Sequence, residues 1–192
     1  MIHDERLLYL KYAETLKYPS ALKHAVTGFF QEDAIINIVH PLNQLKGSKA
    51  YLEHFLLPLQ NSLQGLYRRD DIFMLGTFEG KKWISSTGYY VGQFIKDWLG
   101  IKASGDLSYL RYGEFHRIGD YGAVESYIFL DIPELMIACN QWPLDIGPGH
   151  SRGYTGLIQG PASHDGVLKQ NCDPKEGKLS YQIVTDMLSN LA

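Results

Sequence analysis

The sequence contains little cysteine, little excess charge and no long apolar run, and each absence argues against a class of protein. Its two cysteines, Cys139 and Cys172, form no CxxC pair and are too few for a disulfide framework, so we expect a reducing compartment. The formal net charge is −3 and the pI is about 6.1, without a run of Lys or Arg, which argues against nucleic-acid or membrane-surface binding. The longest apolar stretch is too short to span a bilayer.

Several common catalytic motifs are also missing. The sequence contains no GxSxG, no Walker loop, no dinucleotide-binding fingerprint and no HExxH, which argues against the usual hydrolase, NTPase, oxidoreductase and zinc-protease signatures. The first residues, MIHDERLLYLKY, lack the basic start and apolar run of a secretory signal. Together with the low cysteine content, this predicts a cytoplasmic protein.

What the sequence does contain is typical of a globular domain. It has 192 residues, of which 45% are apolar and 20% are charged, which is enough for a hydrophobic core without disulfides. Helical spacing of apolar residues predicts two helices separated by Pro19, and a third that begins at Ser48 and is kinked or ended by Pro58. Strand patterns and turn signals predict strands at 34–40, 71–78, 82–94, 107–118 and 123–130.

Helices followed by a meander of long strands are typical of an α+β fold. We expect a curved antiparallel sheet with the N-terminal helices packed around it, forming a cone with a pocket for a small, largely apolar molecule. Residues 1–142 are assigned to this domain. Residues 143–192 form an extension, in which a Gly- and Pro-rich loop precedes a helix capped by Asp173. This extension is expected to pack on the same domain or on a partner subunit.

Three stretches carry a resemblance to one family. Residues 87–105 contain TGYYVGQF followed by LGI and ASG, residues 117–125 read RIGDYGAVE, and residues 125–136 contain ExYxxxDxxxLM. In this order they resemble the TGxxxGxF…LGIPATG, R…DG.I.E and E.W…D…LL motifs of the SnoaL-like polyketide cyclases, a branch of the nuclear transport factor 2-like (NTF2-like) superfamily. Tyr127 stands where the family usually has Trp, and the tail from Pro143 onward is additional.

The resemblance implies a cofactor-independent enzyme that closes a ring by intramolecular aldol condensation of a small hydrophobic carbonyl substrate. The family's acid/base aspartate falls on Asp131. Such a carboxylate can remove a proton α to a carbonyl if burial raises its pKa. The sequence Asp131-Ile132-Pro133-Glu134 is also a helix-start signature with Asp131 as the N-cap, and both interpretations remain open at this point.

His116 is the second catalytic candidate. In a strand, its side chain shares a face with Glu114 and Tyr112, whereas Arg117 lies on the opposite face. The resemblance implies a pocket-facing histidine near this position in some members, but a slip of one residue in register would place Arg117 there instead. A histidine buried in the sheet for structural reasons is the alternative.

Further side chains are expected to line the pocket and to contact the substrate. They are His40, Tyr90, Trp98, Tyr112, Glu114 and Tyr127. The aromatic members could clamp a flat ring or chain, although aromatic residues equally build cores and interfaces. His40 could instead be a strand-end residue that precedes Pro41.

The sequence indicates no cofactor and no metal site, because the spacing of His40, His116 and Asp131 does not require a metal. The expected partner is a small hydrophobic molecule, not nucleic acid or a membrane. The resemblance implies a homodimer or higher homo-oligomer, since a second subunit commonly covers the exposed sheet face in this superfamily. The Gly-bearing loops around His150 and His164 could cover the pocket mouth or act as surface or dimer arms. A non-catalytic small-molecule-binding protein on the same scaffold is the alternative function.

Overall fold

The computed structural model describes residues 4–16, 18–144 and 173–191. Its centre is one curved, unclosed sheet in the strand order β2-β1-β6-β5-β4-β3. The strands are β1 (Phe30–Ile38), β2 (Gln44–Lys46), β3 (Leu63–Phe78), β4 (Lys81–Phe94), β5 (Leu107–Gly119) and β6 (Gly122–Leu130). Neighbouring strands are antiparallel, except that β1 and β6 run parallel.

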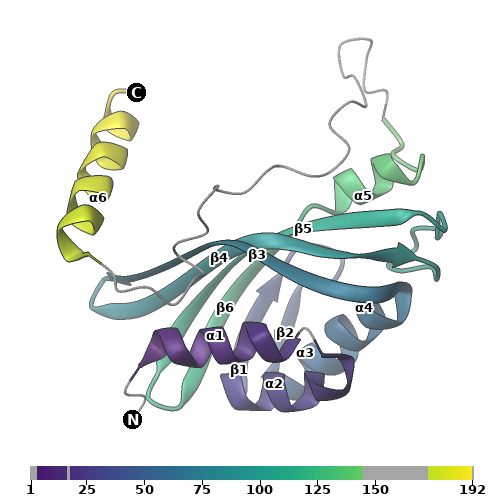
Figure 1. The fold of residues 1–192 in the computed structure, drawn as a ribbon, viewed down its shortest axis with the longest axis horizontal. Coiled ribbons are helices and arrows are strands. Elements are labelled where there is room, and N and C mark those ends of the chain that lie inside the picture. The colour runs from purple at the N-terminus through teal and green to yellow at the C-terminus, as the bar shows by residue number, and fades with distance from the viewer. Residues whose placement is uncertain (1–3, 17, 145–172, 192) are drawn as a thin grey trace.

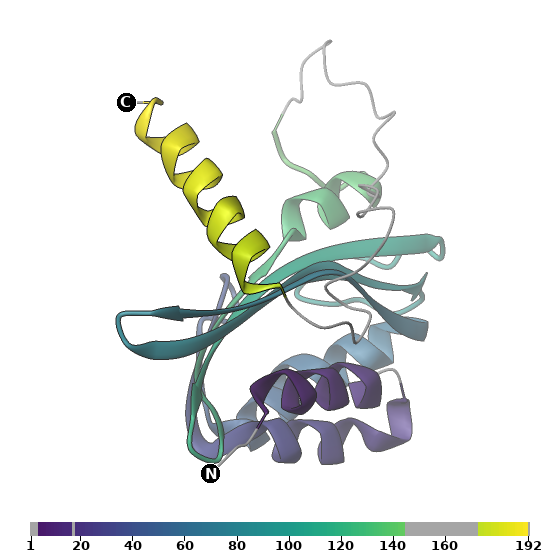
Figure 2. The ribbon, with the colours of Figure 1, turned by 60° about the vertical axis from the view of Figure 1, so that its left-hand side comes forward.

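The helices lie on both sides of the sheet (Figures 1 and 2). The concave side is covered by α1 (Glu5–Leu16), η1 (Pro19–Ala21), α2 (Leu22–Phe29), α3 (Gly47–Tyr51), η2 (Leu52–Leu56) and α4 (Leu57–Ser62). The opposite side carries α5 (Ile132–Ala138) and α6 (Pro174–Ser189). This arrangement confirms the predicted α+β cone, with the N-terminal helices packed inside the curve of the sheet.

The core lies between these helices and the inner face of the sheet. Along β5, alternate residues from Ser108 to Ile118 are buried, and the residues between them are half-buried or exposed. Because side chains of a strand point alternately to its two faces, this pattern separates an inner face from an outer one. Apolar side chains of α1 and α2, including Tyr12, Val26 and Phe29, pack against the inner face.

The helical stretch from Gly47 to Ser62 shows how the chain accommodates Pro58. Its middle segment, Leu52–Leu56, is π-helical, and α4 then continues past Pro58 to Ser62. Proline has no backbone N–H for the regular helical hydrogen bond, and a wider turn before it accommodates that missing bond. Pro58 therefore neither ends the helix nor breaks it.

The long hairpin of β3 and β4 begins earlier than the sequence pattern predicted. We expected the first strand to begin at residue 71, but β3 begins at Leu63, directly after α4. The predicted turn at Glu79-Gly80 is confirmed, and both residues have positive φ angles, of 51° and 71°. Two consecutive positive φ angles are typical of the type I′ turn, whose twist matches that of the flanking strands.

The C-terminal helix α6 is confirmed, and Asp173 caps it by accepting a hydrogen bond from the backbone N–H of Lys175 at 2.8 Å. All of its described residues are exposed. The Gly- and Pro-rich loop that precedes it, with His150 and His164, lies outside the described residues. None of the described helices has both the length and the apolar character needed to cross a bilayer.

Candidate functional site

A group of polar side chains lies buried at the centre of the inner face, and we call it the interior cluster. Its members are Tyr9 of α1, Arg68 and Asp70 of β3, Ser86 and Tyr90 of β4, Tyr112, Glu114 and His116 of β5, and Ser126 of β6. Each of these side chains is at most 5% exposed. Four neighbouring strands and one helix therefore direct their polar groups to one place in the interior of the cone.

Arg68 is the centre of the cluster. Its guanidinium donates hydrogen bonds to Asp70 Oδ1, from Nη2 at 3.0 Å and from Nε at 3.1 Å, and to Tyr90 Oη at 2.9 Å. Nη2 also donates to Glu114 Oε1, and the guanidinium carbon lies 4.1 Å from the centre of the Tyr112 ring. A planar guanidinium suits such multiple hydrogen bonds and ring stacking, for which a lysine would be a poor substitute.

The charges in the cluster alter one another's pKa values. Burial acts to raise the pKa of Glu114, but the positive charge of Arg68, with a further contribution from the neighbouring His116, outweighs it and holds this pKa well below its usual range. Burial acts to lower the pKa of Arg68, but Asp70 and Glu114 raise it well above its ordinary value. One positive charge on Arg68 faces two negative charges, so the cluster carries −1 when His116 is neutral.

His116 lies on the inner face with no exposed surface, whereas Arg117 points outward and pairs with Glu125 at 2.7 Å. His116 Nδ1 is 2.8 Å from Ser126 Oγ, and either atom can donate, depending on the tautomer. Nε2 lies 3.4 Å from Glu114 Oε1, within ion-pair distance, but the geometry is not that of a hydrogen bond. Among the described residues, Nε2 therefore has no hydrogen-bond partner.

Tyrosine hydroxyls supply the hydrogen-bond donors of the cluster. Burial raises the pKa of Tyr90 to about 12, and burial also raises the pKa values of Tyr9 and Tyr112 well above the ordinary value. These phenols therefore remain protonated at neutral pH. Tyr112 donates to Asp70 Oδ1 at 2.6 Å, and Tyr9 donates to Glu114 Oε1 at 2.8 Å.

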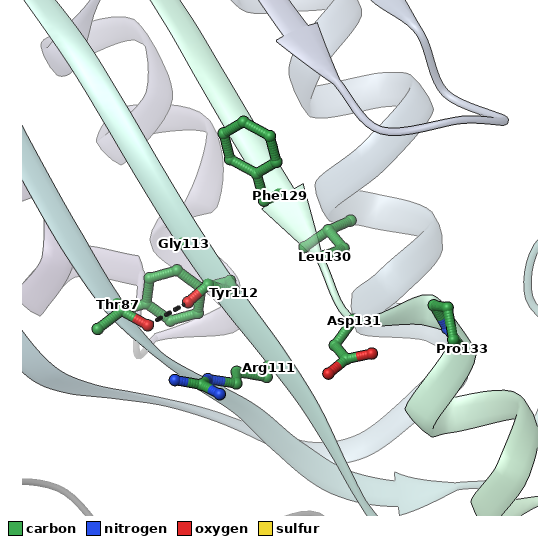
Figure 3. Close-up of a pocket in the computed structure, with 8 residues that line it drawn as sticks. All are labelled: Thr87, Arg111, Tyr112, Gly113, Phe129, Leu130, Asp131 and Pro133. Carbon is green, nitrogen blue, oxygen red and sulfur yellow. Dashed lines mark hydrogen bonds between the residues drawn. The ribbon is translucent and has the colours of Figure 1, made fainter. Parts of the chain in front are cut away.

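Asp131 lies on the other side of the sheet. It follows β6 directly, and its carboxylate accepts a hydrogen bond from the backbone N–H of Glu134 at 3.1 Å, which makes it the N-cap of α5. It borders an outer hollow of about 490 Å³ between the sheet and α5 (Figure 3). The other residues lining this hollow are Thr87, Arg111, Tyr112, Gly113, Phe129, Leu130 and Pro133. Asp131 and His116 therefore do not face one cavity in the structure, and Asp131 occupies the helix-cap position that the sequence offered as its alternative role.

The strand register explains this separation. His116 is directly opposite Ser126 in the β5–β6 ladder, and both point inward. Residue 131 differs from residue 126 by an odd number, so alternation along the chain sends Asp131 to the outer face. The same alternation brings Glu114 and Tyr112 to the inner face with His116, as the sequence predicted.

The remaining expected site residues divide into two groups. Tyr90 belongs to the interior cluster, and Trp98 is buried in the core with its ring centre 6.5 Å from that of Phe55. His40 is exposed, and Tyr127 lies on the outer face, where it donates to Glu125 at 2.7 Å. His40 therefore lies at the surface, and strand alternation in β6 places Tyr127 on the outer face, so neither residue belongs to the interior cluster.

Five cluster members were not expected from the sequence: Tyr9, Arg68, Asp70, Ser86 and Ser126. The charged stretch Arg68-Arg69-Asp70 precedes residue 71, where the strand was expected to begin, so it was placed outside the sheet. Once β3 is known to include it, residues 68 and 70 share a face by alternation, and this signal could have identified them. Within the described part of the chain, no set of three His, Cys, Asp or Glu side chains could hold a metal ion.

No protein-family model and no curated protein sequence matches the chain. Solved structures do match it. AclR from Streptomyces galilaeus, a proposed hydroxylase, is 14% identical with a TM-score of 0.60, over 75% of this chain and 89% of that protein. IdmH from Streptomyces antibioticus, a proposed polyketide cyclase, is 13% identical with a TM-score of 0.58, over 72% and 99%.

Two further solved structures match the chain with similar sequence identity, TM-score and coverage. A proposed SnoaL-like polyketide cyclase from Jannaschia sp. CCS1 is 14% identical with a TM-score of 0.56, over 73% of this chain and 92% of that protein. An NTF2-like protein from Burkholderia thailandensis is 12% identical with a TM-score of 0.55, over 75% and 100%. At this identity the likeness establishes the fold. The chain has the fold shared by SnoaL-like polyketide cyclases and NTF2-like proteins, as its sequence motifs predicted.

Proposed function

We propose that the protein is a cofactor-independent enzyme that performs acid/base chemistry on a small, largely apolar carbonyl compound inside the cone. The observation that supports this most strongly is the burial of Arg68, Glu114 and His116 together on the inner face. Well-packed apolar side chains of similar volume often stabilise a core as much as a buried ion pair does. Buried, mutually perturbed charges in the interior of such a fold are therefore better explained by chemistry than by stability.

In this proposal His116 is the general base. Neutral His116 takes a proton from the carbon α to the substrate carbonyl onto Nε2, and the electron pair of the broken C–H bond becomes part of an enolate. The imidazolium that forms is stabilised by Glu114, 3.4 Å away, and the charge of the cluster changes from −1 to zero. Ser126 at Nδ1 holds the ring in place. The same proton is then available for return to the product.

The enolate oxygen needs hydrogen-bond donors in a dry site. Arg68 and the hydroxyl of Tyr90 are suitable, since both are buried and remain protonated at neutral pH. In the structure Arg68 donates to Tyr90 and to the two carboxylates, so a substrate must displace part of this network. Asp131, assigned the base role by family resemblance, is in this proposal a helix cap.

The test is solvent deuterium exchange into the α carbon of α-tetralone, an aromatic ketone, followed by proton NMR. The wild-type protein should accelerate exchange, and His116→Asn should reduce the acceleration by about 10²-fold or more while the protein remains folded. Asp131→Asn is the matched control and should leave the rate unchanged, because asparagine is also a good N-cap. Loss of exchange in Asp131→Asn instead would return the base role to Asp131.

A non-catalytic function on the same scaffold is favoured by one observation: the cluster is closed, and Tyr9, Glu114 and His116 have no exposed surface. A protein that only binds or stores a small molecule would bind α-tetralone without accelerating exchange. Binding measured by titration calorimetry, with no exchange above the buffer rate, would identify this alternative.

We also propose that the protein forms a homodimer through its outer sheet face. Met74, Phe115 and Phe129 point to this face and are 59%, 45% and 54% exposed. Large apolar side chains gathered on one exposed face commonly mark an interaction surface. In this proposal a second copy of the chain covers them.

A further inference from the structure

Tyr9 differs from every other member of the interior cluster, because it comes from α1 and not from the sheet. Its ring stacks on Phe73, with centres 5.0 Å apart and planes inclined by 24°, and it meets the edge of Phe29 at 5.9 Å. The His116 ring centre is 6.0 Å away. An aromatic ring from outside the sheet is therefore enclosed beside the proposed base.

The hydroxyl of Tyr9 has partners that both give and take hydrogen bonds. It accepts from Arg68 Nη2 at 2.8 Å and donates to Glu114 Oε1 at 2.8 Å, and Asp70 Oδ1 is 3.2 Å away. The phenol thus occupies a site with a fixed donor, a fixed acceptor and an aromatic wall. These are the features by which a protein binds a small aromatic ligand.

The attachment of α1 makes displacement of Tyr9 physically reasonable. A hollow of about 110 Å³ separates part of α1 from α2 and reaches Tyr12, whose ring centre is 6.1 Å from that of Tyr9. The buried side chains of Leu10, Tyr12, Ala13 and Leu16 also pack α1 into the core. An ion pair joins Glu5 to the exposed Lys82, and such surface pairs contribute little stability. Helix α1 takes no part in the strand pairing, so moving it would break no hydrogen bond of the sheet ladder.

We propose that Tyr9 occupies the place of the ligand, and that the site beneath α1 takes a hydroxylated aromatic or enolic ring whose hydroxyl replaces that of Tyr9 between Arg68 and Glu114. This inference rests on the proposed function, since it names the substrate class of the same interior site. Tyr9 then acts as an internal competitor, which the ligand displaces by moving α1.

The chemistry of the cluster selects a neutral hydroxyl over the alternatives. A purely apolar ring would leave Arg68 and Glu114 without the hydrogen bonds that they make to Tyr9, and unsatisfied buried groups are costly. A carboxylate would be repelled by Asp70 and Glu114, because the cluster already carries −1 with His116 neutral. A hydroxyl can accept from Arg68 and donate to Glu114 at once.

The test compares β-naphthol with β-methylnaphthalene, which has a similar shape but no hydroxyl. Binding to the wild-type protein is measured by titration calorimetry, and hydrogen exchange of backbone amides follows α1. We expect β-naphthol to bind, β-methylnaphthalene to bind at least about tenfold more weakly, and exchange to rise in α1 but not in β5. Equal binding of the two compounds, no binding of either, or unchanged exchange in α1 would overturn the proposal.

Two variants separate displacement of Tyr9 from the mere filling of a cavity. Tyr9→Ala removes the competitor and should bind β-naphthol about tenfold more tightly than wild type, with the preference for the hydroxyl retained. Tyr12→Ala is the matched control, because Tyr12 is also buried on α1 but its hydroxyl is hydrogen-bonded to Tyr51, at 3.3 Å, and not to the interior cluster in the described part of the chain. This variant should bind β-naphthol no more tightly than wild type does. A gain in Tyr12→Ala equal to that in Tyr9→Ala would show a generic cavity and overturn the proposal.

These binding experiments do not depend on turnover. If β-naphthol displaces α1 but His116→Asn leaves deuterium exchange unaffected, the proposed catalysis fails and the binding site stands. If exchange depends on His116 but β-naphthol neither binds selectively nor moves α1, the catalysis stands and the ligand class is wrong.

Discussion

At the scale of single residues, the interior cluster is held by a few strong electrostatic contacts. Arg68 balances Asp70 and Glu114 where water does not reach, and each of the three depends on the others. Removing one partner leaves an uncompensated buried charge, which costs much more than the pair itself contributes. Substitutions in the cluster should therefore affect stability far more than substitutions in the surface pairs.

We expect Arg68→Leu to lower the free energy of unfolding by about 3–5 kcal/mol, because Asp70 and Glu114 would remain buried without their cation. Arg117→Leu is the matched control, since its pair with Glu125 is partly exposed, and it should cost at most about 1 kcal/mol. Urea unfolding of both variants measures the difference. Equal losses for the two variants would show that Arg68 is not the centre of a buried network.

The depressed pKa of Glu114 predicts how stability depends on pH. As the pH falls, the unfolded chain takes up a proton on this residue before the folded protein does, because the folded pKa is the lower one. The stabilisation is complete above the ordinary glutamate pKa of about 4.3, and is lost as the pH falls from there toward the folded-state pKa. Urea unfolding at a series of pH values should therefore show a weaker acid-induced loss for Glu114→Gln than for wild type. If stability fell equally with pH in the two proteins, the depressed pKa of Glu114 would be contradicted.

At the scale of secondary-structure elements, two of the quoted motifs have local physical explanations. Thr87-Gly88 lies in β4 opposite the irregular pairing of β3 at Asp70 and Ile72. A Cβ at Gly88 would collide with the backbone carbonyl of Arg69. Glycine is thus required at this close approach of the β3 backbone, and Asp131 begins α5 as its cap.

We expect Gly88→Ala to destabilise the protein by about 1–3 kcal/mol, because β3 would have to move away from β4. Gly113, on the neighbouring strand β5, has open space where a Cβ would be. Gly113→Ala should therefore change stability by no more than about 0.5 kcal/mol. Thermal unfolding of the pair checks this, and similar stability of the two variants would show that the contact at Arg69 is not limiting.

The helix-capping role of Asp131 gives a prediction about stability alone, independent of any catalysis. Asp131→Ala should cost about 1 kcal/mol of stability, because the N–H of Glu134 loses its acceptor, whereas Asp131→Asn should cost little. Chemical unfolding of the two variants provides the measurement. Equal stability of Asp131→Ala and wild type would exclude the capping role.

The sequence predicts those elements that neighbouring residues encode, and it misses those that depend on residues distant in sequence. The turn at Glu79-Gly80, the hairpin ending at Gly119 and Gly122, and the cap at Asp131 are encoded by neighbouring residues, and all are present. The start of β3 at Leu63 was missed, because a charged stretch that is buried only by partners distant in sequence looks like a surface segment. For the same reason, Arg68 was not identified from the sequence as a residue of the interior cluster.

At the scale of the whole molecule, the sequence motifs predicted the cone, and alternation along β5 predicted the shared face of His116, Glu114 and Tyr112. Alternation along β5 could not predict which side chains of β6 share the inner face with these three residues, since this depends on the pairing of His116 with Ser126. Asp131, assigned to the site by the family resemblance with helix capping as the alternative, lies outside the interior cluster and caps α5. Tyr9 could not be found either, because its place depends on how α1 packs beneath the sheet.

The proposed dimer is also tested at this scale. Analytical ultracentrifugation of the full chain should show a dimer, and Phe115→Glu should shift it toward monomer by placing a charge on the apolar outer face. Tyr121→Glu is the matched control, since Tyr121 is more exposed but lies in the turn between β5 and β6, and it should remain dimeric. A monomeric wild-type protein would contradict the proposed interface.

The central claim is that the interior cluster beneath α1, and not the outer hollow beside Asp131, is the binding site. A crystal structure of the protein with β-naphthol tests it most directly. We expect the naphthol ring against Phe73, its hydroxyl in hydrogen-bond contact with Arg68 and Glu114, and Tyr9 displaced. A ligand bound instead beside Arg111 and Asp131, with Tyr9 still buried in the cluster, would contradict the account.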